Sequence, residues 1–109
     1  MSWVAYRKPK SIAEALTLLD EAAGRGRVMA GGTDLIPQLR QREYGADLLV
    51  DITGIEELKH IRGDDGWIQI GAAVTHAEVA KNSLIQKEAR ALAEGCARVG
   101  SPQIRNMAT

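Results

Sequence analysis

The stretch that decides the fold is Val28-Met29-Ala30-Gly31-Gly32-Thr33-Asp34-Leu35, in which an apolar run is followed by two glycines and a polar pair. This order is typical of a buried strand, a tight turn and the start of a helix. Glycine has no Cβ, so backbone N–H groups at such a turn can approach a ligand closely. A helix that begins at Thr33 or Asp34 adds unpaired N–H groups and the positive end of its dipole, and these together favour phosphate binding.

The same stretch also has a purely structural interpretation. Two glycines between a strand and a helix form an ordinary tight turn, and Thr33-Asp34 is an ordinary helix cap. The glycines follow neither the G-x-G-x-x-G spacing of dinucleotide-binding loops nor the pattern of a P-loop, which ends in Lys and Ser or Thr. From these residues alone, phosphate binding and a structural turn both remain open.

Length and composition indicate one globular domain or a piece of one. The chain has 109 residues, of which 45% are hydrophobic. Its 14 basic and 14 acidic side chains cancel, which gives no electrostatic reason to expect nucleic acid or an anionic membrane as a partner. No apolar run is long enough to span a membrane, and the first residues do not resemble a signal peptide. The single cysteine, Cys96, favours a reducing compartment, so we expect a cytoplasmic protein.

The first half of the chain alternates between predicted strands and helices. We expect strands over residues 4–7, 27–30 and 48–50, and helices over 12–23 and from the glycine turn to about residue 42. Ser11 and Glu14 form a capping box, and the first helix is expected to bury one apolar face. This face consists of Ile12, Ala15, Leu16, Leu19 and Ala23. A strand, a helix and a strand in succession imply a parallel pair with a right-handed crossover.

The second half of the chain predicts a hairpin and two helices. One helical turn is expected over 55–58, and strands over 59–62 and 67–72 flank a turn at 63–66. Capping boxes at Thr75 and Ser83 begin a short helix and a longer one. The longer helix carries an apolar stripe of Ile85, Ala89, Leu92, Cys96 and Val99. The predicted fold is a small two-layer α+β unit, with a short mixed or parallel sheet and flanking helices.

Few side chains of this sequence suggest catalysis or metal binding. Cys96 lies on the apolar stripe, and we expect it to pack as a small hydrophobic residue. The sequence has no second cysteine to complete a metal site. His60 and His76 fall in different predicted elements, and His76 has a role only if its helix start faces the same cavity as the glycine turn. We expect Asp64 and Asp65 to be solvated residues of the hairpin turn. We therefore assign no catalytic residue and no metal ligand.

Segments along nearly the whole chain resemble one family. Residues 27–35 resemble the first flavin-binding motif of the FAD-binding subunit of molybdenum hydroxylases, the medium subunit in xanthine dehydrogenase and aerobic carbon monoxide dehydrogenase. Residues 71–78 are similar to a further family segment, and residues 101–109 to the approach to the second flavin motif. The family continues that motif with an aliphatic residue, Gly-Gly and Asn. We therefore expect that the natural chain continues beyond Thr109 and that residues 1–109 are the N-terminal subdomain of an incomplete FAD-binding domain.

The resemblance implies a fold and a set of cofactor contacts. The fold is the first subdomain of a flavin domain of the p-cresol methylhydroxylase type. In the family the glycine loop wraps the FAD pyrophosphate with backbone amides, and the second motif and the helix end before it also approach the cofactor. The matching positions here are Val28, Met29, Ala30, Gly31, Gly32, Thr33, Asp34, Leu35, Val99, Gly100, Ala108 and Thr109. Thr75 is a further, weaker match.

The resemblance also implies a role in electron transfer. The subunit would pass electrons from iron–sulfur centres through FAD to an acceptor such as NAD, beside a molybdopterin-binding large subunit and a 2Fe–2S small subunit. Two alternatives stay open: a stand-alone FAD-dependent reductase of the same superfamily, and a cofactor-free interaction domain in which the glycine turn is structural. The Ser101-Pro102-Gln103-Ile104-Arg105-Asn106 segment argues against the stand-alone reductase. FAD binding by residues 1–109 alone is in doubt, because the second glycine pair is not among them.

Overall fold

A computed structural model describes residues 4–31 and 46–109. The chain divides into two compact units, residues 1–57 and 58–109, and each unit is described by itself. Within the described ranges no helix is long and apolar enough to cross a membrane.

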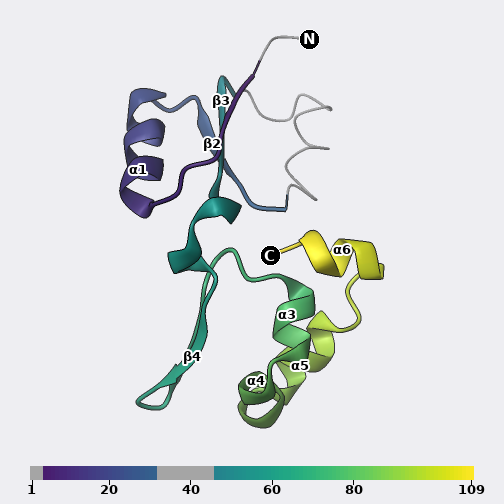
Figure 1. Cartoon of the computed structure of the whole chain (residues 1–109). Helices are drawn as coiled ribbons and strands as arrows, with labels where there is room; N and C mark the ends of the chain where they lie inside the picture. The colour runs from purple at the N-terminus through teal and green to yellow at the C-terminus, as the bar shows by residue number, and fades with distance from the viewer. Residues whose placement is uncertain (1–3, 32–45) are drawn as a thin grey trace. The chain divides into compact units, whose positions relative to one another are not determined.

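Unit 1 is built on a three-stranded parallel sheet (Figure 1). Strand β3 (Leu48–Asp51) lies in the middle and pairs with β1 (Ala5–Arg7) on one side and β2 (Gly26–Met29) on the other. The register places Ala5 and Gly26 opposite Leu48, and Met29 opposite Asp51. The predicted parallel pairing of β2 and β3 is confirmed, whereas the helix predicted between them lies outside the described residues.

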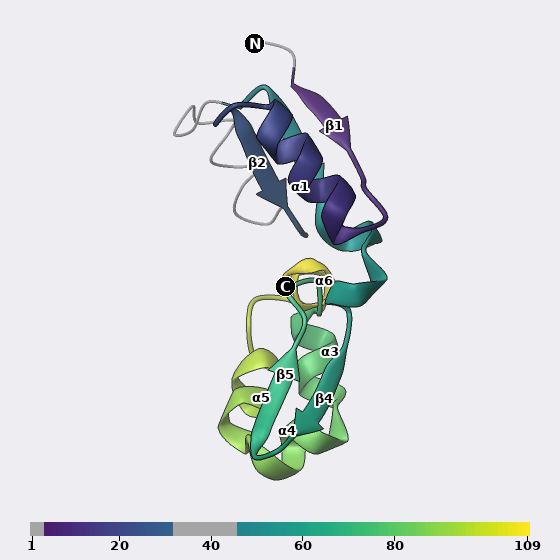
Figure 2. The same ribbon diagram turned by 90° about the vertical axis from the view of Figure 1, so that its left-hand side faces the viewer.

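Helix α1 (Ile12–Glu21) covers one face of this sheet (Figures 1 and 2). Its predicted capping box forms, since the Ser11 side chain accepts a hydrogen bond from the Glu14 N–H. The predicted buried face is only partly correct. Ala15 is buried and Leu19 is half-buried, but Ile12 and Leu16 are exposed, and the turn after the helix exposes Ala23. The sheet is narrow, so its strands contact only part of the apolar stripe.

The core of unit 1 lies at the middle strand and just after it. Val50 and Ile55 are fully buried, and Pro9 is a third fully buried side chain of this unit. The short 3-10 helices η1 (Ile52–Gly54) and η2 (Glu56–Leu58) follow β3, and η2 confirms the predicted helical turn. The continuous apolar run at 48–50 forms this middle strand, in which Leu49 and Val50 are buried.

Unit 2 begins with an antiparallel hairpin of β4 (Ile61–Asp64) and β5 (Trp67–Ile70). The turn is two residues, shorter than the predicted one at 63–66. Asp65 and Gly66 both have positive φ, as a type I′ turn requires, and Asp-Gly is favoured there. Asp64 therefore lies in β4 opposite Trp67, rather than in the turn. The hairpin is a separate two-stranded sheet (Figure 2). Its Ile61 and Ile68 side chains pack against the unit's core.

Four short helices form the rest of unit 2. They are α3 (His76–Lys81), α4 (Ser83–Glu88), α5 (Arg90–Cys96) and α6 (Pro102–Met107). The Thr75 capping box is confirmed, because Thr75 accepts a hydrogen bond from the Glu78 N–H. The Ser83 box is wrong: Asn82 ends α3 and caps α4 by accepting from the Ile85 N–H.

The predicted long helix of unit 2 is divided at Ala89. This residue leaves helical geometry, with φ −142° and ψ 55°, so α4 and α5 pack against each other instead of forming one rod. The division brings Ile85 and Cys96 into one core with Val79 and Ala93. Leu92 and Val99, predicted on the same stripe, are exposed as a result.

Candidate functional site

The first predicted cofactor segment leaves the carboxyl end of β2, an edge strand of the parallel sheet. Val28 is 50% exposed, and Met29, Ala30 and Gly31 are each half-buried. In open α/β sheets, ligands bind at the carboxyl ends of the strands. These four residues lie at that end of β2. Gly32, Thr33, Asp34 and Leu35 complete the predicted loop but lie outside the described residues.

A buried carboxylate lies beside the point where this segment leaves the sheet. Asp51 is paired with Met29 in the sheet register and is only 6% exposed. One carboxylate oxygen accepts hydrogen bonds from the Thr53 N–H at 2.9 Å and the Thr53 hydroxyl at 2.6 Å. The other oxygen accepts from the Tyr6 hydroxyl. Residues from β1, β3 and η1 are thus joined at one carboxylate.

The charge of Asp51 is stabilised by these contacts. Burial alone would raise the pKa of the carboxyl, but the hydrogen bonds from Thr53 and Tyr6, together with the charge of Lys8, lower it below the ordinary value. The hydrogen bond to Asp51 in turn raises the pKa of the Tyr6 hydroxyl. Asp51 is therefore a charged structural group at neutral pH, with its donors supplied from within unit 1.

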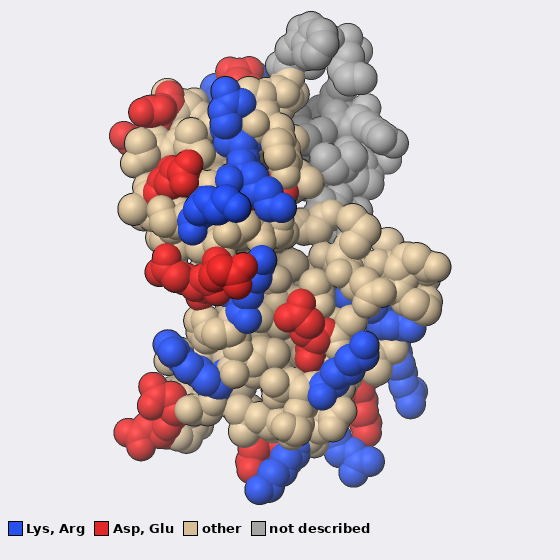
Figure 3. Space-filling model, in the orientation of Figure 1, with Lys and Arg blue, Asp and Glu red and all other residues tan. Residues whose placement is uncertain are grey.

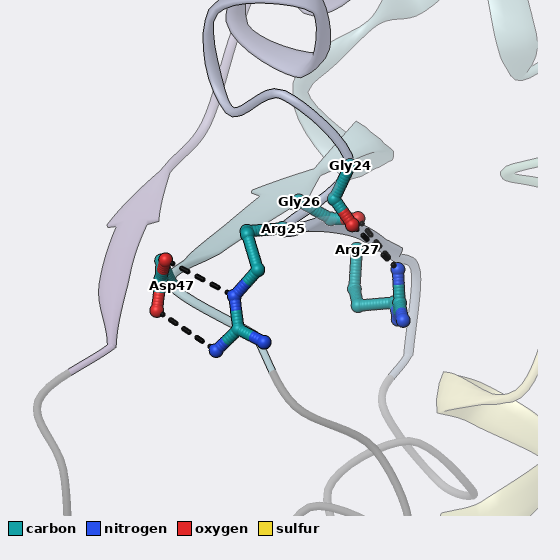
Figure 4. Close-up of polar contacts among 5 residues, drawn as sticks. All are labelled: Gly24, Arg25, Gly26, Arg27 and Asp47. Carbon is teal, nitrogen blue, oxygen red and sulfur yellow. Dashed lines mark hydrogen bonds and ion pairs between the residues drawn. The ribbon is translucent and has the colours of Figure 1, made fainter.

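Two arginines hold the opposite, amino-terminal end of β2 (Figure 4). The Arg25 guanidinium makes two contacts of 3.2 Å with the Asp47 carboxylate. The backbone carbonyl of Arg25 also accepts a hydrogen bond of 2.8 Å from the Asp47 N–H. Arg27 donates to the carbonyl oxygens of Gly24 and Gly26. The β2 and β3 strands are thus joined where residues 46–47 bring the chain back to the sheet.

The second predicted cofactor segment surrounds α6 in unit 2. Gly100 has a positive φ of 52°, and a Cβ there would lie 3.2 Å from the Ile104 side chain. Ser101 caps α6 by accepting a hydrogen bond from the Ile104 N–H. Arg105 donates to the carbonyl oxygens of Val99 and Gly100 at 3.1 and 3.2 Å. This arginine therefore reaches back from α6 and fixes the loop before it.

The other end of α6 is held by His76. The His76 N–H donates to the Ala108 carbonyl oxygen at 2.9 Å, and the ring Nδ1 lies 2.8 Å from the same oxygen. Ala108 is 8% exposed, and its own N–H donates to the Ile104 carbonyl. Thr109 follows and is exposed. Sequence reasoning considered His76 only in relation to the glycine turn and assigned no role to Arg105, so it predicted neither of these contacts.

The residues of the second segment fit a ligand with both an anionic and an aromatic part. Residues 99–109 contain one arginine and no acidic side chain. Their exposed apolar side chains are Val99, Ile104 and Met107. FAD combines an anionic pyrophosphate with two aromatic ring systems, so backbone donors beside exposed apolar groups suit it.

The remaining sequence candidates have structural roles. Cys96 is buried in the core of unit 2, and the Thr75 side chain is occupied in capping α3. In the part of the chain that the structure describes, no group of three or more His, Cys, Asp or Glu residues could hold a metal ion. Acidic and basic side chains are interspersed over the face that Figure 3 shows, in agreement with the balanced charge.

Comparison with known proteins identifies the family. The chain matches the model of the FAD binding domain in molybdopterin dehydrogenase over residues 2–109. It is 37% identical over 102 residues to the nicotinate dehydrogenase FAD-subunit of Eubacterium barkeri, covering 93% of this chain and 34% of that protein. It is 33% identical over 104 residues to the carbon monoxide dehydrogenase medium chain of Hydrogenophaga pseudoflava, covering 95% and 36%. The chain thus spans about a third of the length of these relatives.

Solved structures of related enzymes are also similar to this chain. A structure of carbon monoxide dehydrogenase from Hydrogenophaga pseudoflava matches with a TM-score of 0.93 and 31% identity, over 99% of this chain and 38% of that one. Quinoline 2-oxidoreductase from Pseudomonas putida 86 matches with a TM-score of 0.92 and 30% identity, over 99% and 38%. The predicted fold class, family and FAD cofactor are confirmed. The relatives are named as dehydrogenase subunits, in agreement with the predicted oxidoreductase subunit.

Proposed function

This chain belongs to the family of FAD binding domains in molybdopterin dehydrogenases, and from that membership we propose that it works in electron transfer. Its subunit passes electrons from iron–sulfur centres through FAD to an acceptor such as NAD. The family match over residues 2–109 carries this proposal, because it includes both segments predicted to contact the cofactor.

The chain's own residues bind and orient the cofactor in this proposal. FAD supplies the redox chemistry when bound, and the protein supplies position and environment. In unit 1 the residues that would hold it are Val28, Met29, Ala30 and Gly31, followed by Gly32, Thr33, Asp34 and Leu35. In unit 2 they are Val99, Gly100, Ala108 and Thr109. The exposed apolar side chains around α6 would keep water from an aromatic ring.

The proposed partners follow from the division of chemistry among subunits. The relatives are named as an FAD-subunit and as medium chains, so they are components of multi-subunit enzymes. We propose a molybdopterin-binding large subunit and a 2Fe–2S small subunit as partners here, with substrate hydroxylation at the molybdenum of the large subunit. A cytoplasmic location, predicted from the single cysteine, belongs to the same proposal.

The experiment that tests this function uses the complete gene product. The purified protein is expected to be yellow, to show the visible absorption of oxidised flavin, and to take up FAD after the cofactor is removed. Co-purification with iron and molybdenum is expected when the native complex is isolated, and NAD should reoxidise the reduced flavin. A colourless protein that takes up no FAD would contradict the flavoprotein assignment. A yellow protein without iron or molybdenum would favour the stand-alone reductase.

A further inference from the structure

We propose that His76 is a positioning residue for the cofactor, because its ring holds the peptide group that joins Ala108 to Thr109. This inference rests on the proposed contact of these two residues with FAD. His76 is the first residue of α3, and Ala108 directly follows α6, so the contact joins two helices of the same unit. It ties the end of the second cofactor segment to the body of unit 2.

The chemistry of the contact fixes the protonation of the ring. A carbonyl oxygen only accepts hydrogen bonds, so the Nδ1 atom 2.8 Å away from it must carry the proton. The same oxygen accepts from the His76 backbone N–H at 2.9 Å. Both lone pairs of the Ala108 carbonyl are thus taken by one residue. The peptide plane is therefore held against rotation from a fixed point on α3.

The hydrogen bonds of His76 to the Ala108 carbonyl also determine the orientation of the Thr109 N–H. Described peptide bonds are trans, so the Thr109 N–H points away from the Ala108 carbonyl oxygen. The carbonyl points to His76, and the N–H of Thr109 points to the opposite side of the peptide. This N–H donates to no acceptor among the described residues. The His76 ring thereby fixes the direction in which the chain presents a backbone donor, and a fixed donor binds an anionic oxygen without a further ordering cost.

The Ala108 N–H is held as well, which makes the arrangement rigid. It donates to the Ile104 carbonyl at 2.8 Å, so both backbone polar groups of Ala108 are occupied and its side chain is buried. Helices α3 and α6 lie in contact with each other. A substitution of His76 therefore removes only the hydrogen bond from the ring, because the backbone N–H is kept by every residue except proline.

The test compares two substitutions in the complete gene product. His76→Asn places an amide Nδ2 near the position of the ring Nδ1 and keeps the donor, whereas His76→Leu keeps much of the volume and removes the donor. Loss of one hydrogen bond corresponds to about a 2- to 10-fold weaker Kd for FAD. We expect this loss in His76→Leu and a Kd close to wild type in His76→Asn. Titration of the apoprotein by flavin fluorescence measures the Kd, and the melting temperature of each apoprotein reports its stability.

The outcomes separate this inference from the proposed function. A wild-type protein that binds no FAD contradicts the function itself. A wild type that binds FAD, with His76→Leu binding equally well, overturns only the positioning role. Equal weakening in both variants also overturns it, because shape and not the donor would then matter. The control Arg90→Gln removes the exposed ion pair with Glu94 on α5 and is expected to leave the Kd unchanged.

A measurement on the wild type guards against variants that fail to fold. Long-range ¹H–¹⁵N correlation spectra at about pH 8, where an ordinary histidine is neutral, identify which ring nitrogen carries the proton. We expect the Nδ1–H tautomer for His76. A ring protonated only at Nε2 cannot donate to Ala108 and would overturn the inference.

Discussion

The two predicted cofactor segments are held in different ways. The segment at the end of β2 is an extension of a parallel sheet, and its position follows from strand register, with Met29 opposite Asp51. The segment around α6 has no sheet to continue. It is held by side chains that reach backbone carbonyls, Arg105 at its start and His76 at its end. The first is thus set by the backbone, and the second by two named side chains together with the backbone N–H of His76.

This difference predicts how each segment responds to mutation. A register of backbone hydrogen bonds survives most changes of exposed side chains, because every residue contributes the same groups. A carbonyl that accepts from a guanidinium or an imidazole loses that side-chain donor with a single substitution, and the Ala108 carbonyl then keeps only the backbone N–H of His76. We therefore expect cofactor affinity to be more sensitive to surface substitutions in unit 2 than in unit 1.

The largest effect is expected at Gly71, which lies very close to the backbone of Leu58. A Cβ at Gly71 would lie 2.0 Å from the Leu58 carbonyl oxygen, a backbone atom that cannot move aside cheaply. Gly71→Ala is expected to destabilise the protein by about 3 kcal/mol or more, as strong overpacking does. In the matched control Gly63→Ala, the new methyl group meets Leu84 at 3.4 Å, an ordinary contact. Urea unfolding compares the two, and equal stabilities would contradict the close approach at Gly71.

A smaller loss is expected from the buried carboxylate of unit 1. Asp51→Asn keeps the shape, but its one amide oxygen can replace only the acceptor for Thr53, with neutral hydrogen bonds, and its NH2 group cannot accept from the Tyr6 hydroxyl, at a cost of about 1–2 kcal/mol. Because the pKa of Asp51 is lowered on folding, its contribution is complete above about pH 4 and is lost as the pH falls further. Acid unfolding of the variant should show a weaker pH dependence. The exposed turn variant Asp65→Asn should match wild type.

The loop before α6 should show an intermediate effect. Arg105→Gln removes both hydrogen bonds to the carbonyls of Val99 and Gly100, at a cost of about 1 kcal/mol. We expect FAD to bind several-fold more weakly, with Arg105→Lys between the variant and wild type, since an ammonium group lacks the guanidinium fork. Calorimetric titration of the apoproteins measures this. Unchanged affinity in Arg105→Gln would show that this loop is held by its backbone, as the segment of unit 1 is.

The smallest effect is expected at the ion pair of unit 1. Arg25→Gln breaks the contact with Asp47, but both side chains are more than half exposed. The hydrogen bond from the Asp47 N–H to the Arg25 carbonyl remains in the variant. Melting temperature and FAD affinity should therefore both match wild type, at low and at high salt. A clear loss of FAD affinity would mean that side chains also position the first segment.

Local signals predicted the parts of the fold that depend on neighbouring residues. The caps at Ser11 and Thr75 each need only a hydroxyl and an N–H three positions on, and both form. The division at Ala89 could not be predicted, because alanine is the best helix former and only packing of α4 against α5 interrupts it. The cap at Asn82 was predictable, since asparagine caps helices as well as serine does.

The motifs predicted the candidate site as a list of positions, which stays a prediction, but they did not predict the contacts that hold those positions. The glycine turn and the tail at 108–109 were recognised from their motifs. The contact of His76 with Ala108 joins residues 32 positions apart, and the sequence holds no periodicity that links them. Its histidine was considered for a site only in relation to the glycine turn. Packing of α3 on α6 gives it a partner within its own unit.

The middle position of β3 has a consequence for how the chain folds. In the described sheet, β1 and β2 pair with β3 and not with each other. Ala5 of β1 and Gly26 of β2 both pair with Leu48, so neither strand has its partner until β3 is in place. Contacts between such distant residues form slowly, whereas the hairpin of β4 and β5 closes over a turn of two residues. During synthesis from the N-terminus, β1 and β2 therefore stay unpaired until β3 has left the ribosome.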